Sequence, residues 1–275
     1  MPRAIPRRRL LAALAALPVS ACAGGPGAGI WRRHDPASRR RVDHRVWQVF
    51  LDRNTRDWPD GITRVDYARV STTDRELLDA YIREQEAVPV PSLSRRAQLA
   101  FWLNLHNALV VRLILSRPLV RSPDDIEAGG LFSRGPWRRP LATVAGRSVS
   151  LEGIRREVLA PVFRDPRWHY ALCDGTLGAP SLSRRAYGGD DLDRRLEDAA
   201  IDYIGHPRAV DPAPQRPGTV RLNALWRRHM ADFGGGIEGV FASIDLYAEP
   251  ELRTALRAMP AVLWMDDRRL NDIRA

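Results

Sequence analysis

The segment "SRRAQLAFWLNLHNALVVRLILSRP", residues 94–118, decides the fold. It holds no glycine and no proline before its last residue, and Ser94 stands where a helix cap is expected. Apolar residues fall on most faces of a helix drawn through the segment, so it is not a surface helix with one face in water. We therefore predict a central helix that is buried nearly all round.

Two amides of this helix need hydrogen-bond partners. Asn104 and Asn107 are three residues apart and share one face. A buried amide without a partner costs about 1–3 kcal/mol, so both side chains must bond to something. They could fix the backbone of a loop, which we favour, or they could line a polar pocket together with His106.

Patterns on both sides of this helix predict an α+β fold: a mainly helical single domain with a small sheet, expected to be antiparallel. Asp74 is the expected cap of one helix, and Pro161 the expected end of another. The alternation and central glycine of residues 142–151 predict a hairpin. Further helices are expected at residues 43–54, 75–88, 151–159, 192–204, 225–248 (two helices, separated by Gly234–Gly236) and 251–259, and strands at 169–173 and 218–225.

Arginine supplies all of the positive charge. The 275 residues include 43 basic ones, none of them lysine, and the net charge is +10. The arginines occur singly and in pairs among acidic residues, which favours a solvated surface over a nucleic-acid site. Weak binding to anionic lipid or polysaccharide stays open. The 44% of hydrophobic residues suffices for a substantial core.

The N-terminus has the layout of a secretory leader. Basic residues at Arg7–Arg9 precede an apolar run, residues 10–19, that is too short to span a bilayer. Val19–Cys22 resembles the lipobox of bacterial lipoproteins, which would make Cys22 the lipidated first residue of the mature chain. The alternative is an ordinary cleaved leader with an incidental Cys22. The arginines fit either a plain basic region or a twin-arginine export signal.

The predicted organisation has three parts. Residues 1–22 form a lipoprotein signal peptide, residues 23–42 a flexible tether rich in glycine, proline and arginine, and residues 43–275 the folded domain. Ala23 after the lipidated cysteine favours the outer membrane by its similarity to known sorting signals. Once Cys22 is lipidated, Cys173 has no partner for an intramolecular disulfide.

Several blocks of the chain occur in a familiar order. "AFWLNLHNALVVRLIL", "GPWRRPLATVAGRSVSLEGIRREVL" and "DPRWHYALCDGTLGAPSLSRRAY" are followed by "RHMADFGG" and "AVLWMDDRRLND". From about Asp43 to Asp272 the chain resembles the domain of unknown function 547 family, as a bacterial lipoprotein-like member. The resemblance implies an architecture and no particular reaction.

The chain departs from the family where chemistry is expected. The family pattern His-Phe/Tyr-Ala-x-Asn-Cys-Ala-Ser-x-x-Cys-Pro aligns with residues 169–180 without a gap. His169 matches, but Cys173 replaces the asparagine, Asp174 the first cysteine and Ala179 the second. Thiol hydrolases need a cysteine, a histidine and a carboxylate, so the resemblance implies that this chain has lost the parts of such a site.

Three arginines mark further departures from the family. Arg155 and Arg156 stand where the family tends to have Glu-His, and Arg268 replaces the tryptophan of the closing segment. A carboxylate in place of a thiol and arginines in place of an acid and a histidine could pair in space. We therefore expect Asp174 either to form an ion pair with Arg155 or Arg156, or to cap a turn.

Cys173 has two readings. In an extended strand it would lie about 13 Å from His169 on the same face, too far for an ion pair. If the chain turned at Leu172 the two side chains could meet, but nothing in the sequence requires such a turn. We therefore favour a buried, inert thiol over a nucleophile assisted by His169 or His106.

The sequence leaves three functions open. We favour a non-catalytic envelope lipoprotein, a binding or structural module that reaches the membrane through its lipid and has an unknown envelope protein or polymer as partner. The alternatives are a thiol-dependent hydrolase or acyl-transfer enzyme using Cys173 with His169 or His106, and an arginine-mediated binder of anionic envelope polymers. No P-loop, dinucleotide fingerprint or paired-cysteine motif occurs, so we predict no cofactor and no metal.

Overall fold

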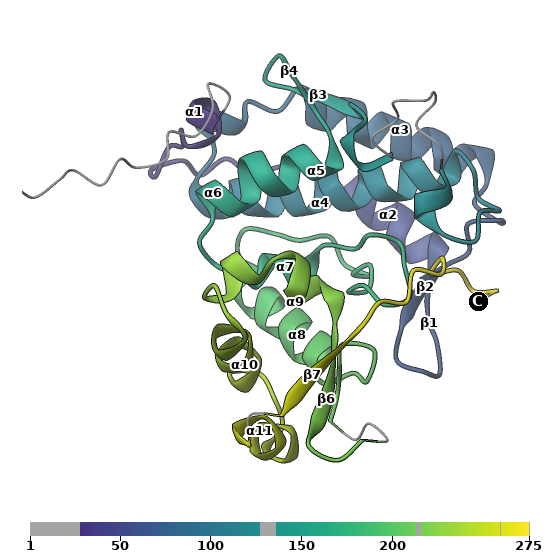
Figure 1. Ribbon diagram of the computed structural model, residues 1–275. Helices are drawn as coiled ribbons and strands as arrows, with labels where there is room; N and C mark the ends of the chain where they lie inside the picture. The colour runs from purple at the N-terminus through teal and green to yellow at the C-terminus, as the bar shows by residue number, and fades with distance from the viewer. Residues whose placement is uncertain (1–27, 127–135, 213–215, 259, 275) are drawn as a thin grey trace, which may run out of the picture.

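The apolar helix α4 (Arg95–Leu115) lies at the centre of the computed structural model, which describes residues 28–126, 136–212, 216–258 and 260–274. The predicted leader, with Cys22, lies outside the described residues. Helix α3 (Thr72–Glu86) packs on α4, and α2 (Arg45–Asn54) packs on α3. The run from α5 (Leu151–Gly153) to α6 (Ala160–Val162) lies beside α4 (Figure 1).

The burial of α4 confirms the predicted central helix. Seventeen of its 21 side chains are buried, and the Ser94 hydroxyl caps the helix by accepting from the Ala97 N–H at 3.4 Å. Among the described helices α4 alone is long and apolar enough to cross a membrane, yet 94% of its most apolar window is buried by other parts of the chain. A helix in a protein core can be as apolar as a helix that spans a membrane, so composition alone does not distinguish the two.

The second part of the structure packs below this helical layer in Figure 1. There α8 (Leu192–Ile204) packs on α7 (Trp168–Ala171). A separate hydrophobic cluster around Tyr170, Tyr203 and Trp226 forms its core. The remaining helices of this part are α9 (Ala224–Arg228), the 3₁₀ turn η5 (Met230–Phe233), α10 (Ile237–Asp245) and α11 (Pro250–Arg257).

The sheets are small, and the mixed α+β prediction is confirmed. Two are antiparallel hairpins, β1 (Thr55–Asp57) with β2 (Thr63–Val65) and β3 (Ala142–Val144) with β4 (Arg147–Val149). The second is the predicted hairpin. The third sheet has the order β5 (Val210–Asp211), β6 (Thr219–Asn223), β7 (Ala261–Met265), and its β6–β7 pair is parallel. The helices α10 and α11 provide the crossover that a parallel pair requires.

The chain after β7 runs back across the molecule (Figure 1). The Leu177 and Gly178 N–H groups donate to the carbonyls of Arg269 and Asp267, and the Asn271 N–H donates to the Gly175 carbonyl. Glycine is required at position 178, because a Cβ there would lie 2.9 Å from the Asp267 backbone N and O. The C-terminal segment is thereby held against residues 174–178.

Three expectations need correction. Ordered structure begins before residue 43: α1 (Ala28–Trp31) packs the Trp31 ring edge-on to Trp102, with centroids 5.1 Å apart. Ser71, not Asp74, caps α3, because its hydroxyl accepts from the Asp74 N–H. Residues 169–173 are not a strand, since α7 continues to Ala171 and neither Leu172 nor Cys173 belongs to a strand.

The helix that begins at Leu151 also passes Pro161 instead of ending there. Its middle, η4 (Ile154–Leu159), is a π-helical turn in which the Ala160 N–H donates to the Arg155 carbonyl. A helix interior normally loses a hydrogen bond at proline. The wider turn shifts the bonding pattern before Pro161 is reached, and the helix continues to Val162.

Candidate functional site

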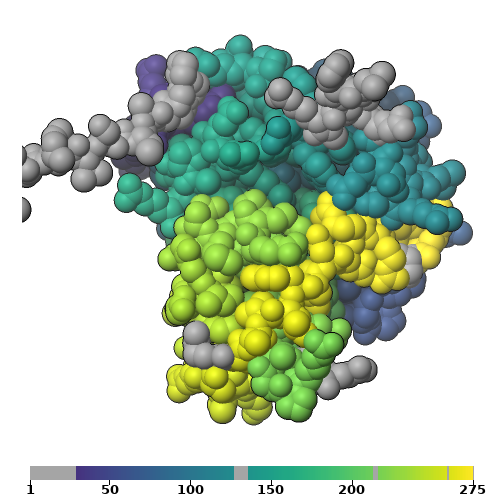
Figure 2. Space-filling view, in the orientation of Figure 1, coloured from purple at the N-terminus to yellow at the C-terminus, as the bar shows by residue number. Residues whose placement is uncertain are grey.

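A cavity of about 790 Å³ opens between the helical layer and the second part of the structure. The space-filling view shows the C-terminal segment, in yellow, lying beside the line where teal and green surfaces meet (Figure 2). Arginines dominate the polar part of the wall: Arg155, Arg156, Arg228 and Arg268. The lining carboxylates are Glu152, Asp174 and Asp232.

Asp174 is fully committed to hydrogen bonds. One carboxylate oxygen accepts from the Thr176 N–H at 2.9 Å and from the Thr176 hydroxyl at 2.6 Å, and the other accepts from Arg268 at 2.6 Å. Burial by itself would raise the pKa of Asp174, but Arg268, Thr176 and Arg155 lower it below its usual value. The side chain is therefore an ionised structural carboxylate that also caps a turn, as one of the two expectations had it.

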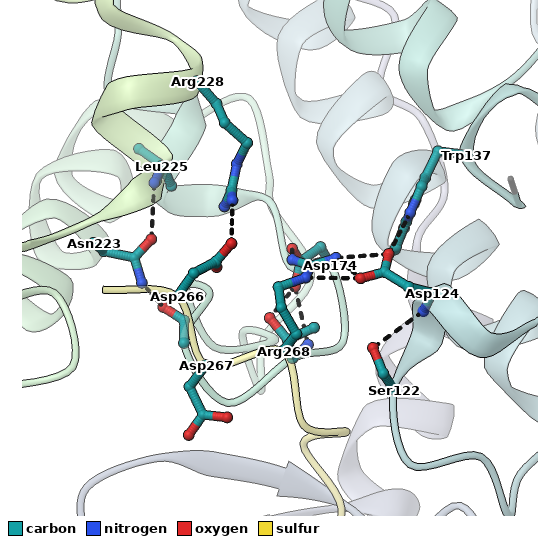
Figure 3. A network of polar contacts seen from close by, with 12 residues as sticks. Ser122, Asp124, Trp137, Asp174, Asn223, Leu225, Arg228, Asp266, Asp267 and Arg268 are labelled. Atoms are coloured by element: carbon teal, nitrogen blue, oxygen red, sulfur yellow. Dashed lines mark hydrogen bonds and ion pairs between the residues drawn. The ribbon is translucent and has the colours of Figure 1, made fainter. Parts of the chain in front are cut away.

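The predicted partners of Asp174 were wrong. The ion pair is with Arg268, which also contacts Asp124 at 2.8 Å, while Asp124 accepts from the Trp137 indole (Figure 3). Arg156 is exposed and pairs with Glu152 at 3.0 Å. The sequence analysis named Arg268 but did not predict it as the partner of Asp174, because the return of the C-terminal segment to residue 174 is a long-range contact with no local signal.

Arg155 has no ion pair and no hydrogen bond from its side chain to any described residue. Its Nε is buried and unbonded, and the residue lies partly buried in the cavity wall. Burial lowers the pKa of Arg155, although Asp174 opposes this, and a guanidinium keeps its proton under any physiological condition. The π-helical turn thus holds an unneutralised cation at the cavity.

His106 is a second polar group without a full set of partners. It is 1% exposed and lines the cavity, and among the described atoms its Nε2 has no hydrogen-bond partner. Its Nδ1 lies 3.5 Å from Asn107 Oδ1, which is too long for a good hydrogen bond. Burial and the nearby Arg155 hold the pKa of His106 well below its usual value, so the ring is neutral.

Asn104 and Asn107 fix loop backbone, as favoured from the sequence. Asn104 donates to the Tyr187 carbonyl at 2.8 Å and accepts from the Tyr187 N–H at 2.9 Å. Asn107 donates to the Ala171 carbonyl and accepts from the Cys173 N–H. Of Asn104, His106 and Asn107, only His106 lies in the cavity wall.

Cys173 and His169 do not form a catalytic pair. Cys173 is 3% exposed and is not part of the cavity wall, and burial raises its pKa to about 12. The turn of α7 directs His169 toward η5 instead, where His169 Nε2 lies 2.9 Å from Asp232 Oδ2. The geometry therefore lacks the thiolate and the thiol–imidazole contact that nucleophilic catalysis needs.

His229 joins His169 and Asp232 at this point. One donor atom from each of the three side chains lies within 4.8 Å of the others. Neither His229 nor Asp232 was singled out from the sequence. The signal that could have found them is the His-x-x-Asp spacing one residue before a glycine run, which places both side chains on one face of a 3₁₀ turn.

The family model described as "Protein of unknown function, DUF547" matches residues 90–204. The match begins just before α4 and ends with α8, so it includes His106, Arg155, His169 and Asp174. His229, Asp232 and Arg268 lie beyond it. No curated protein and no solved structure matches the chain significantly.

Proposed function

We propose that this chain is an exported, membrane-anchored envelope lipoprotein whose folded domain binds a compact anionic ligand in the arginine-lined cavity and performs no thiol catalysis. One observation carries the binding role: the Arg155 guanidinium faces the cavity with no counter-ion among the described residues. A buried charge is costly unless it is paired. A carboxylate or phosphate in the cavity would supply the missing pair.

The neighbouring groups support an anion in this place. Asp174 is paired with Arg268 and Thr176, and Glu152 is paired with Arg138 and Arg156, so neither carboxylate forms an ion pair with Arg155. The neutral His106 ring has an unbonded Nε2 that could donate to an anionic oxygen. Arginine with a second donor is a common arrangement for carboxylate and phosphate recognition.

The position of Asp174 supports the loss of a thiol site. The residue that takes the place of the family's first cysteine lines the cavity beside Arg155, whereas Cys173 lies in the core. If typical relatives carry a nucleophile at position 174, this chain has replaced it by an ion pair with Arg268. The thiol-hydrolase alternative would require Cys173 to reach the cavity.

The binding role is tested by calorimetric titration of the full chain with pyrophosphate and with citrate. The Arg155→Gln variant is compared with Arg117→Gln, because Arg117 is exposed and lies outside the cavity wall. Loss of a charged hydrogen bond costs about 1.5–3 kcal/mol, so Arg155→Gln should weaken binding about tenfold or more. Equal affinities of the two variants for both probes would contradict the proposal.

The anchor is tested separately in a bacterial host. Mass spectrometry of the membrane-bound protein should find a mature chain that begins at Cys22 and carries acyl groups. Cys22→Ser should leave the leader uncleaved or release the protein from the membrane. A cleaved, soluble chain that begins elsewhere would identify an ordinary secretory leader instead.

A further inference from the structure

We propose that His169, His229 and Asp232 form a binding site for a zinc-class divalent metal ion in the wall of the cavity. This inference does not depend on the anion-binding role proposed above. It is based on three donor atoms that lie within 4.8 Å of one another: His169 belongs to α7, Asp232 to η5, and His229 directly precedes η5.

The local fold builds the cluster from sequence. In a 3₁₀ turn residues three apart eclipse one another, so His229, which precedes η5, and Asp232 within it share a face. The Asp232 N–H donates to the His229 carbonyl and closes this turn. Glycine at position 239 lets α10 approach η5, since a Cβ there would lie 2.3 Å from the Phe233 carbonyl oxygen. The backbone under the two donors is therefore fixed.

The donor set suits zinc and its neighbours. Two imidazole nitrogens and one carboxylate oxygen are ligands of borderline transition metals, whereas calcium and magnesium prefer oxygen alone. Ligand atoms in a tetrahedral zinc site are about 3.3 Å apart, from bonds of about 2.0–2.1 Å. The His169–Asp232 contact of 2.9 Å is close to this spacing, and the His229 donor lies within 4.8 Å of both other donors.

The protonation states agree with this geometry. Burial lowers the pKa of His169 to about 4 and that of His229 to about 3, so both rings are neutral at pH 7. The hydrogen bond from His169 lowers the pKa of Asp232, which is therefore a carboxylate. Neutral imidazoles and a carboxylate are already in the protonation state that binds a metal. A metal would therefore displace at most the one proton between His169 and Asp232.

The surroundings favour an ordered site with one open position. The Trp168 ring stacks on His169 at a centroid distance of 3.6 Å, and the centroid of the Phe233 ring lies 5.0 Å from that of His169. These rings hold the imidazole in place and keep water from it. His229 and Asp232 line the cavity, so the metal enters from there and its fourth position faces the cavity.

Arg155 acts against a cation at this site, because its charge lowers the pKa of both His169 and His229. The Asp232 carboxylate offsets part of this repulsion. A simple hydrogen bond between His169 and Asp232 is the competing explanation of the cluster, and it gives His229 no role. Substitution of His229 therefore separates the two explanations.

The test is a titration of the full chain, in detergent and stripped with chelator, with Co²⁺ in a buffer free of phosphate and carboxylate. We expect one Co²⁺ per chain with visible absorption of a four- or five-coordinate ion, displaced by Zn²⁺. His229→Gln and the isosteric Asp232→Asn should each weaken binding at least tenfold. The control His34→Gln, at an exposed histidine outside the cavity, should leave the affinity for Co²⁺ unchanged.

Circular dichroism of each variant shows whether it has folded. Should one variant unfold, the other still decides, because His229 and Asp232 are both partly exposed and reachable without opening the core. Absence of a one-to-one Co²⁺ spectrum, or equal binding by wild type and a folded His229→Gln, would overturn the site. Neither result bears on pyrophosphate or citrate binding, so failure of the metal site and failure of the anion site are distinguishable.

Discussion

Arg268 lies 2.6 Å from Asp174 and joins the last segment of the chain to the turn that follows α7. The Asp174 side chain is 10% exposed and Arg268 28%, so this is a partly desolvated pair. The same guanidinium holds Asp124, and through Asp124 the Trp137 indole (Figure 3). One side chain thus connects three segments that are far apart in sequence.

Arg268→Gln should destabilise the protein, because it leaves the buried Asp174 carboxylate without its cation. Breaking a buried pair costs about 3–5 kcal/mol, and the partial exposure of Arg268 places the expected loss near the lower figure. Asp124→Asn removes a more exposed partner of the same arginine and should cost about 1 kcal/mol or less. Urea unfolding measures both, and equal costs would show that Asp174 does not depend on Arg268.

The thiol at Cys173 should resist alkylation. With a pKa raised to about 12 by burial, on the order of one thiol in ten thousand is ionised at pH 8. Iodoacetamide followed by peptide mapping should find Cys173 unmodified in the native chain and modified after denaturation. Rapid native labelling of Cys173 would revive the thiol-hydrolase interpretation.

Asp174→Cys should introduce a reactive thiol, in contrast to the unreactive Cys173. Position 174 lines the cavity, and Arg155 and Arg268 would stabilise a thiolate there. We expect this new thiol to be alkylated at neutral pH while Cys173 in the same chain stays unmodified. Equal protection of both cysteines would mean that the cavity is closed to small reagents.

Asn107→Ala should cost more than a surface substitution, because it removes both hydrogen bonds that hold the chain between α7 and Cys173. A buried backbone group left without a partner costs about 1–3 kcal/mol. Gln48→Ala is a useful comparison, since Gln48 also bonds loop backbone, at Arg184 and Ala186, but in an exposed or half-buried setting. A similar loss of unfolding free energy in the two variants would show that the burial of Asn107 adds nothing to the cost of removing its hydrogen bonds.

The sequence predicted the parts of this fold that depend on local pattern. The burial of α4, the β3–β4 hairpin, α8 and the bonding of Asn104 and Asn107 to loops all follow from periodicity, turn residues and the need to satisfy buried amides. Residues 169–173 were misassigned because five apolar and aromatic residues suit a strand or a buried helical turn equally well.

The site could be predicted only in part, because its key contacts join distant segments. His106, Arg155 and Asp174 were candidates and do meet at one cavity. The pairing of Asp174 with Arg268 and of His169 with Asp232 spans 94 and 63 residues. Such contacts follow from the path of the C-terminal segment and from the packing of η5, and neither leaves a local pattern in the sequence.

His106 should make the stability of the protein depend on pH. Its pKa in the fold lies well below the unfolded value of about 6.5, so the unfolded chain binds the proton more tightly. Stability from this group is complete above pH 6.5 and falls as the pH drops below it, by at most about 1.4 kcal/mol per pH unit. His106→Gln should remove that part of the pH dependence of the unfolding free energy, measured in urea at both pH values. His34→Gln, at an exposed ring, should leave it unchanged, and an unaltered dependence in His106→Gln would show that the buried ring accepts a proton in the fold.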